Sequence, residues 1–379
     1  MRARLRIPAA LRVLLVSGTA VLAPAAPGAG VRSAALRAPH GVASAARQTH
    51  GYRIGAYYFS GWSHAPNNNL TPLLTQRYPL AAPLSGWYDD SQRQVDQTLV
   101  QAAASGIDFF AFDWYDLARS PYPSDQTLNE GLHYYLRSTQ RQRLNFCLTF
   151  VDQEPFLPRA RDWPSLIALW LAYFRQSDYV RVNGKPLFII FSPERMRTIF
   201  GSSRAVRAAL TLLRARARAA GLPGVSIAVA TTLTPHYNPG RIGQVLSEGY
   251  DLTTGYNYHG VGGEQDNVAV PYARLVQENE QMWDRVARHV PLPYIPVLTT
   301  GWDQRFSARE LHRAIIYAGR TPAQFFCYTA AARRWLDQNA PRTPREKIVL
   351  LFAWNEIGEG GAYAVALQLA FTPAQPPTC

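Results

Sequence analysis

Residues 348–363 read IVLLFAWNEIGEGGAY, and the predicted fold depends on this stretch. The apolar residues 348–352 are followed by closely spaced glycines, a pattern typical of a strand buried on both faces that ends in a tight loop. Glu356 and Glu359 stand in that loop. Side chains alternate along an extended strand, so the two carboxylates become neighbours, about 5–6 Å apart, only if the exit forms one helical turn. We therefore expect such a turn.

Neighbouring carboxylates push their pKa values apart, so that one group holds a proton while the other is ionised. Glu356 and Glu359 would then supply an acid and a base within one turn. The alternative is a solvated acidic loop. Trp354, Asn355 and the glycines, placed at the end of a deeply buried strand, favour the acid–base pair.

Apolar runs and amphipathic segments alternate from residue 52 onward. The candidate strands are residues 53–59, 107–112, 146–151, 186–191, 226–230, 252–256, 294–298 and 348–352. The candidate helices are residues 91–105, 124–141, 163–173, 203–220, 270–289, 308–318 and 321–338. Eight strands separated mainly by helices predict the α/β class and a (β/α)₈ TIM barrel. A doubly wound open sheet is the alternative, but residues 60–63 do not form its Gly-rich phosphate turn.

The amino-terminal segment differs in composition from the rest of the chain. A basic start followed by an apolar, small-residue stretch predicts a signal peptide over residues 1–26, and residues 27–50 predict a flexible Ala/Gly/Arg-rich tether. We expect the barrel over residues 51–372, a tail over residues 373–379, and a secreted or cell-surface location. An uncleaved membrane anchor is the alternative, and only in that case do we expect a membrane partner.

The net charge of +13 does not indicate a nucleic-acid partner. The first fifty residues hold seven arginines and no acidic residue, which leaves 32 basic and 26 acidic side chains in the remainder. No basic block interleaved with aromatic residues appears. The three cysteines, Cys147, Cys327 and Cys379, have no metal-ligand spacing, and their odd number leaves at least one thiol unpaired. We expect neither a metal nor another cofactor.

Aromatic, amide and acidic residues follow nearly every candidate strand. In a TIM barrel these strand ends carry the active site. Sugars pack their C–H faces on aromatic rings and need fixed donors and acceptors for their hydroxyls, so an oligo- or polysaccharide is the expected partner. The candidate substrate-binding residues are Tyr57, Tyr58, Trp62, Asp113, Trp114, Tyr256, Tyr258, His259, Trp302, Asp303, Trp354 and Asn355. Asp113 faces either the barrel mouth or a structural partner, and His259 either binds a hydroxyl or caps a turn.

Five segments in this order resemble the glycoside hydrolase family 99-like barrels. That family includes endo-acting α-mannosidases and proteins encoded in bacterial surface-polysaccharide clusters. The segments are residues 56–58 (AYY), 106–115 (GIDFFAFDWY), 179–188 (YVRVNGKPLF), 321–325 (TPAQF) and 354–360 (WNEIGEG). The resemblance implies an α-linked, mannan-like substrate and a retaining glycoside hydrolase with Glu356 as base and Glu359 as acid. It also implies that the sugar's own 2-hydroxyl attacks the anomeric carbon and gives a 1,2-anhydro sugar.

Two features depart from the family pattern. Ile357 stands where members usually carry Trp, and residues 361–365 contain no further carboxylate. Two other functions remain open. A catalytically silent glycan-binding barrel would not need both glutamates, and a sugar transferase would need a diphosphate site or a metal-binding pair of aspartates.

Overall fold

The computed structural model describes residues 51–62, 69, 71, 73–78, 82, 86–87, 89–233, 238–260, 267–306 and 314–361. The expected signal peptide (1–26), tether (27–50) and tail (373–379) lie outside these residues. In the described part of the chain, no helix has the length and apolar character needed to cross a membrane. The described residues belong to one compact unit, Thr49–Cys379.

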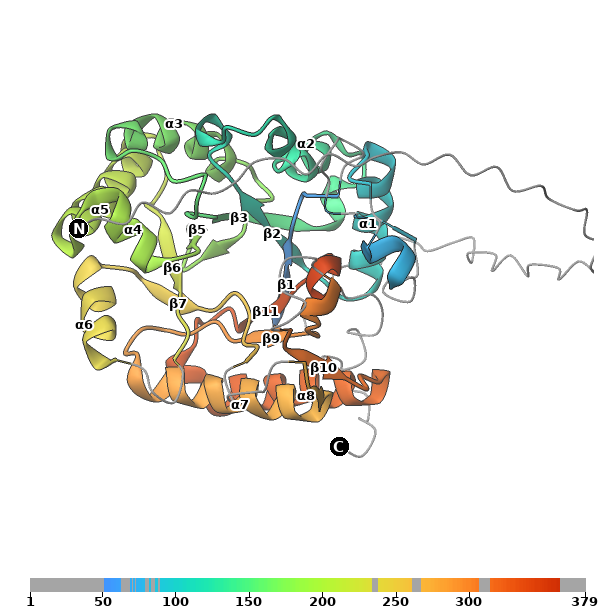
Figure 1. Cartoon of the computed structure of the whole chain (residues 1–379). Helices are drawn as coiled ribbons and strands as arrows, with labels where there is room; N and C mark the ends of the chain where they lie inside the picture. Colours follow the sequence, from blue (N-terminus) through green and yellow to red (C-terminus); the bar gives the residue numbers. More distant parts are fainter. Residues whose placement is uncertain are drawn as a thin grey trace, which may run out of the picture. The chain divides into compact units, whose positions relative to one another are not determined.

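Eight parallel strands form a nearly closed barrel (Figure 1). In chain order they are β1 (Arg53–Tyr58), β2 (Phe109–Trp114), β3 (Asn145–Phe150), β5 (Lys185–Ile190), β6 (Ser226–Ala230), β7 (Leu252–Thr254), β9 (Val297–Thr299) and β11 (Ile348–Phe352). Their order in the sheet is β7-β6-β5-β3-β2-β1-β11-β9. Thr253 of β7 and Tyr294, just ahead of β9, form a parallel bridge between the two ends of the sheet. All eight predicted strands and the TIM barrel are therefore confirmed.

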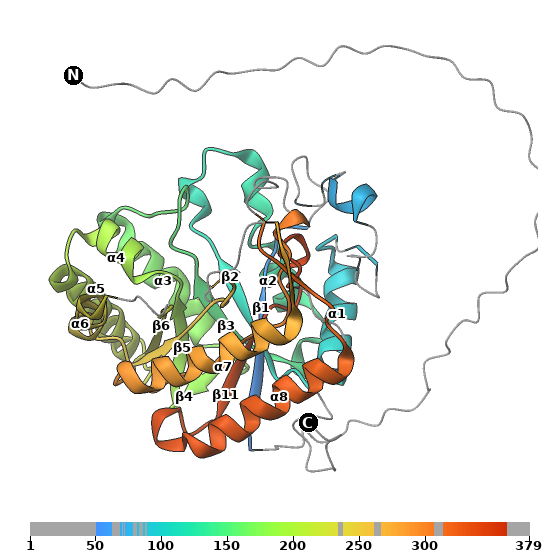
Figure 2. The ribbon, with the colours of Figure 1, turned by 60° about the horizontal axis from the view of Figure 1, so that its bottom comes forward.

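Helices cover the outside of the barrel, and α7 and α8 lie along the same side of it (Figure 2). The helices are α1 (Gln92–Ala104), α2 (Glu130–Arg137), α3 (Trp163–Phe174), α4 (Pro193–Phe200), α5 (Ser203–Ala219), α6 (Pro239–Glu248), α7 (Tyr272–His289) and α8 (Pro322–Gln338). Side-chain caps explain several starts. Ser91 accepts from Gln94 N, and Thr321 and Gln324 form a reciprocal capping box.

The predicted helix over residues 308–318 is wrong at its end. Residues 307–313 lie outside the described residues, but Ile316–Ala318 form strand β10, which pairs in parallel with β8 (Ala269–Pro271). A short apolar run has no unique period, so the β-branched Ile315 and Ile316 fit a strand equally well. The sequence-based prediction also missed α4 and α6, which Ser192 and Asn238 cap, and the short strand β4 (Arg181–Val182), which pairs antiparallel with β5.

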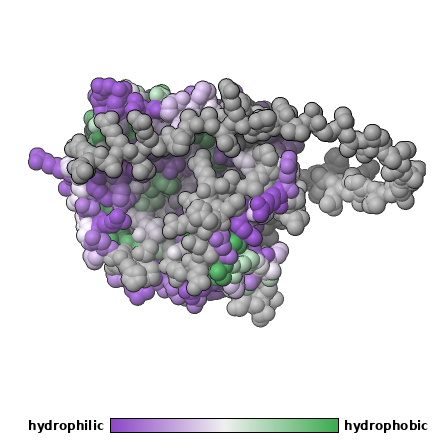
Figure 3. Space-filling view, viewed as in Figure 1, coloured by the Kyte–Doolittle hydropathy of each residue, from purple (hydrophilic) through white to green (hydrophobic). Residues whose placement is uncertain are grey.

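Side-chain alternation along β2 separates the barrel interior from the helix layer. Phe112 packs against Tyr135 of α2, and Trp114 packs against Trp170 of α3, with ring centroids 5.3 and 5.4 Å apart. Asp113, between them, must point to the interior. Hydrophilic side chains dominate the outer parts of the face in Figure 3, and hydrophobic ones show in smaller areas between them. Cys147 of β3 is a buried free cysteine.

Candidate active site

The exit of β11 coils as expected. Ile357–Glu359 form one 3₁₀ turn directly after Glu356. Glu359 N donates to Glu356 O at 3.3 Å, and Gly361 N donates to the same oxygen at 2.9 Å. Both glutamates are thus carried by one tight turn at the carboxyl end of a fully buried strand.

Hydrogen bonds to main-chain oxygens fasten this turn to the exit of β9. Asp303 N donates to Glu359 O at 2.8 Å, and Thr300 Oγ1 donates to Gly361 O at 2.6 Å. Gly360 has φ +69°, and a Cβ at this position would lie 2.8 Å from Asp303 N. Only glycine fits such a left-handed, crowded position. The backbone itself therefore sets where the two glutamates stand.

A tyrosine hydroxyl joins two of the site's three carboxyl groups. Tyr256, just after β7, lies with its hydroxyl 2.6 Å from Asp113 Oδ2 and 3.2 Å from Glu356 Oε1. Asp113 is 1 % exposed and Glu356 is 8 % exposed. The Tyr256 ring is held by Tyr57, with ring centroids 4.7 Å apart, and by Phe352, at 5.0 Å. This places three strand ends around one polar centre.

These carboxyl groups have no balancing cation among the residues that the structure describes. Within the described residues, no ion pair involves Asp113, Glu356 or Glu359. Burial raises the pKa of Asp113 to about 8; the Tyr256 hydrogen bond lowers it and the charge of Glu359 raises it. Burial also raises the pKa of Glu359 to about 7. The pKa of Glu356 rises well above its usual value, through burial first and then through the charges of Glu359 and Asp113. Such a group of acids can hold and release protons near neutral pH.

A stacked pair of rings stands near this centre. His259 and Trp302 lie parallel, with centroids 3.4 Å apart and 6° between their planes. Trp302 also meets Phe352, the ring that contacts Tyr256, at 5.8 Å. His259 is half-buried, and its Nδ1 lies 3.0 Å from Asn257 Oδ1. The predicted aromatic residues His259 and Trp302 therefore lie near the carboxyl cluster.

Four predicted substrate-binding residues do not face the site. Tyr58 and Trp114 stand one residue away from the inward-facing Tyr57 and Asp113, and side chains alternate along a strand. Tyr58 packs on Phe112 at 5.0 Å and its hydroxyl donates to the buried Asp90. Trp114 packs against α3, as described above, and Trp354 lies 5.6 Å from Phe110 in the same outer layer. Tyr258 is fully buried, and its hydroxyl pairs with that of Tyr294 at 2.9 Å. For these four residues the prediction is corrected.

Three further predicted residues support the site through contacts within the protein. Asn355 accepts from Phe59 N at 2.9 Å and donates to Phe59 O at 2.7 Å. Asp303 forms a two-point ion pair with Arg305, at 2.9 and 2.6 Å. Trp62 is 1 % exposed and lies 3.4 Å from where a Cβ of Gly358 would stand. Their polar groups and rings fix the exits of β1, β9 and β11.

Tyr115 is a site residue that the sequence-based selection missed. Burial raises its pKa, and so do the charges of Asp113, Glu356 and Glu359. Asn129 clamps its main chain by donating to Tyr115 O at 2.9 Å and accepting from Tyr115 N at 3.0 Å. The signal was its spacing, because Tyr115 lies two residues after Asp113 and so continues the inward face of β2.

The eight parallel strands and the carboxyl groups at their ends define a TIM barrel with a candidate acid–base site. The chain belongs to the glycosyltransferase WbsX family, whose model matches residues 59–364. No curated protein matches it. In the described part of the chain, no cluster of three or more His, Cys, Asp or Glu residues is arranged to hold a metal ion.

Solved structures share this fold. A glycoside hydrolase-like protein is 19 % identical with a TM-score of 0.56, and the match covers 82 % of this chain and 86 % of that one. The GH99 endo-alpha-mannosidase from Bacteroides thetaiotaomicron is 13 % identical with a TM-score of 0.53, again over 82 % and 86 % of the two chains. At these identities the likeness concerns the fold, and it agrees with the resemblance recognised in the sequence.

Proposed function

We propose that the protein is a retaining glycoside hydrolase that cleaves an α-linked polysaccharide, with a mannan-like glycan as the first substrate to test. One observation carries the proposal: Glu356 and Glu359 stand on one turn at the end of β11, both with raised pKa values and with no balancing cation among the described residues. The glycoside hydrolase-like fold of the barrel supports the same class of reaction.

The position of the two glutamates suits a reaction in which the sugar supplies the nucleophile. Glu356 removes the proton of the 2-hydroxyl as that oxygen bonds to the anomeric carbon. The bond from this carbon to the leaving oxygen breaks, and Glu359 protonates the leaving oxygen. Water then attacks the anomeric carbon of the 1,2-anhydro sugar and gives a proton to Glu359, while the 2-oxygen regains its proton from Glu356. Two inversions give net retention.

A pair of carboxylates on one turn approaches the sugar from similar directions. A direct displacement needs carboxyls about 5–5.5 Å apart that flank the scissile bond from opposite sides. Attack by the 2-hydroxyl removes this need, because the protein only moves protons. The half-buried His259, stacked on Trp302, offers a flat surface for the C–H face of a bound sugar.

The test is to incubate the purified protein with a panel of α-linked polysaccharides, α-mannan first, and to measure new reducing ends. Glu359→Gln should stop cleavage of substrates with poor leaving groups and spare those with good ones, which need little protonation. Glu356→Gln should impair both. Efficient hydrolysis of a 2-deoxy glycoside by the unaltered enzyme would contradict attack by the 2-hydroxyl.

A sugar transferase is the second candidate, and the family's description as a glycosyltransferase favours it. The hydrolase and the transferase differ in the sugar substrate that they need. A hydrolase releases reducing ends from a glycan in water alone, whereas a transferase needs an activated sugar donor and releases its leaving group only with an acceptor present. A protein that binds glycan but changes neither substrate would be a binding module.

The proposed substrate lies outside the cytoplasm if residues 1–26 act as a signal peptide. Mass spectrometry of the amino terminus of the protein from cells tests this proposal. A start near residue 27 would support export, and an intact Met1 in the membrane fraction would indicate an uncleaved anchor instead.

A further inference from the structure

The hydroxyl of Tyr256 meets two carboxyl groups but has one proton to give. It lies 2.6 Å from Asp113 Oδ2 and 3.2 Å from Glu356 Oε1. A phenol donates one hydrogen bond and accepts others on its oxygen. At one of the two contacts the tyrosine oxygen must therefore accept, and a carboxyl can donate only when it is protonated. The three groups thus share a proton, which stands on Asp113 or on Glu356.

The surroundings of Asp113 favour a neutral carboxyl. It is 1 % exposed, and its Oδ1 has no hydrogen-bond partner among the described residues. Thr149, which pairs with Asp113 in the register of β2 and β3, is also buried with its Oγ1 unpartnered there. An ionised carboxylate would leave a charged oxygen without a donor in this position, which is costly.

The ionisable groups around Asp113 are acidic or phenolic. Glu356 and Glu359 approach from the exit of β11, and phenols approach from β1, β2 and β7. Those phenols are Tyr57, Tyr115 and Tyr256. No cation in the described part of the chain contributes to the pKa of Asp113, which burial raises to about 8. Both the acids and the burial therefore oppose a negative charge on Asp113.

We propose that Asp113 is a positioning residue that donates its carboxyl proton to the Tyr256 oxygen, directs the Tyr256 proton to Glu356 Oε1, and thereby keeps Glu356 ionised as the base. This inference rests on the proposed role of Glu356. The opposite order of donors would leave Glu356 protonated and unable to take the proton of a sugar hydroxyl. A neutral Asp113 also excludes its use as a nucleophile.

The matched variants are Asp113→Asn and Asp113→Ala. The amide N–H of asparagine can replace the carboxyl O–H as donor to Tyr256, so the Asn variant should keep kcat/KM within about tenfold of the unaltered enzyme. The Ala variant lacks the donor and should lose about a hundredfold or more, in line with a failed general base. Equal, severe losses in both variants would overturn the proposal, because a charged Asp113 is the role that asparagine cannot replace.

The pH profile gives a readout that a merely structural role would not move. As pH rises, Glu359 loses its proton near pH 7 and Asp113 near pH 8. The slope of log kcat/KM against pH should therefore approach about −2 on the alkaline side, and about −1 in Asp113→Asn. An unchanged slope in that variant would contradict the shared proton.

A measurement without substrate separates this inference from the proposed function. In protein labelled with ¹³C at the aspartate carboxyls, NMR should show Asp113 protonated at pH 7 and titrating near pH 8, with Asp113→Asn identifying its signal. Tyr256→Phe, which keeps the ring but removes the hydroxyl, should shift that titration. An Asp113 signal that is already ionised at pH 6 would refute the inference. If no glycan is cleaved but the titration is as expected, the proposed function fails and the proton arrangement stands.

Discussion

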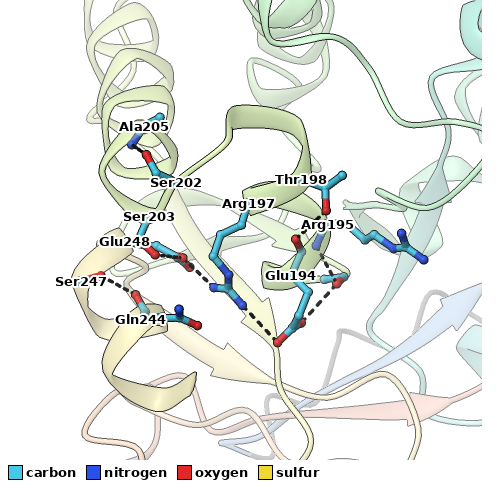
Figure 4. Close-up of polar contacts among 11 residues, drawn as sticks. Glu194, Arg195, Arg197, Thr198, Ser202, Ser203, Ala205, Gln244, Ser247 and Glu248 are labelled. Carbon is cyan, nitrogen blue, oxygen red and sulfur yellow. Dashed lines mark hydrogen bonds and ion pairs between the residues drawn. The ribbon is translucent and has the colours of Figure 1, made fainter. Parts of the chain in front are cut away.

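Two groups of buried carboxyls in this barrel differ in what surrounds them. At the carboxyl ends of the strands, which form the mouth of the barrel, Asp113 and Glu356 share contacts with a single hydroxyl, that of Tyr256. On the outer side, at the end of α6, Glu248 is fully buried and accepts from Arg197 at 2.6 Å and from Ser203 at 2.8 Å (Figure 4). Arg197 also reaches Glu194 at 3.2 Å.

The difference shows that burial alone does not make a carboxyl reactive. Arg197 neutralises the charge of Glu248. The outer carboxyl therefore serves to join α4, α5 and α6. The mouth has no such partner within the described residues, so no cation offsets the burial that raises the pKa values of its acids. Buried acids without a cation are candidates for proton transfer when they gather at strand ends, as Asp113, Glu356 and Glu359 do, whereas Glu248 with its cation joins helices.

The largest expected effect is on activity at the mouth. Glu356→Gln should lower kcat/KM on the cleaved glycan by about 10³-fold, within the range for loss of a positioned base. The same change should leave the melting temperature equal or higher, because it removes a buried carboxyl that lacks a compensating charge. Assays on purified protein and thermal unfolding measure the two effects. A large loss of stability would mean that Glu356 is structural, as Glu248 is.

The next largest effect is on stability at the outer cluster. Arg197→Met leaves the buried Glu248 without its cation and should cost about 3–5 kcal/mol of unfolding free energy, with activity per folded molecule retained. The double change Arg197→Met and Glu248→Leu removes both charges and should recover most of this loss. Urea unfolding measures both. No recovery in the double variant would show that packing, rather than charge, holds these helices together.

A further effect concerns the pH dependence of stability. Burial raises the folded-state pKa of Asp113 to about 8 and that of Asp90 to about 7, against about 3.9 in the unfolded chain. The folded protein therefore binds more protons in this window, and its stability falls as pH rises from about 4 to 8. Each pH unit between the folded and unfolded pKa of a group corresponds to about 1.4 kcal/mol, so the two groups together should give a decline on the order of 10 kcal/mol. Asp113→Asn and Asp90→Asn should each flatten the curve of unfolding free energy against pH, and curves parallel to that of the unaltered protein would contradict the assignment.

The smallest effect is expected at Glu194, which shares Arg197 with Glu248. Its side chain is 46 % exposed, so solvent screens the pair. Glu194→Gln should change the unfolding free energy by less than about 1 kcal/mol. A loss as large as that of Arg197→Met would show that Arg197 needs both carboxylates to stay in place.

The fold was largely predictable because each strand is a compact apolar run. Strands β6 and β11 begin and end at the predicted residues, and the other six differ by a few residues. Helices α4 and α6 were missed although Ser192 and Asn238 could have signalled them, because their apolar faces are short. Strand β10 was predicted as helix, since three apolar residues cannot define a period.

The sequence predicted which residue types form the site better than it predicted which way their side chains point. The turn that joins Glu356 and Glu359 followed from their spacing and the glycines after them. Tyr58 and Trp114 were chosen because they stand at strand ends, but each is one residue out of phase with the inward face. The link from Tyr256 to Asp113 spans 143 residues of chain, and such pairing appears only when the barrel forms.

The bonds that fasten the β11 exit have a consequence for how this protein can change. They are made by main-chain atoms and the Thr300 hydroxyl, so the two glutamates keep their place whatever side chains line the rim, provided Gly360 is retained. Under the proposed function, substitutions at the rim can therefore change the sugar that is accepted without rebuilding the proton-transfer centre. Directed evolution toward new glycans should vary rim positions such as His259 and leave Thr300 and Gly360 untouched.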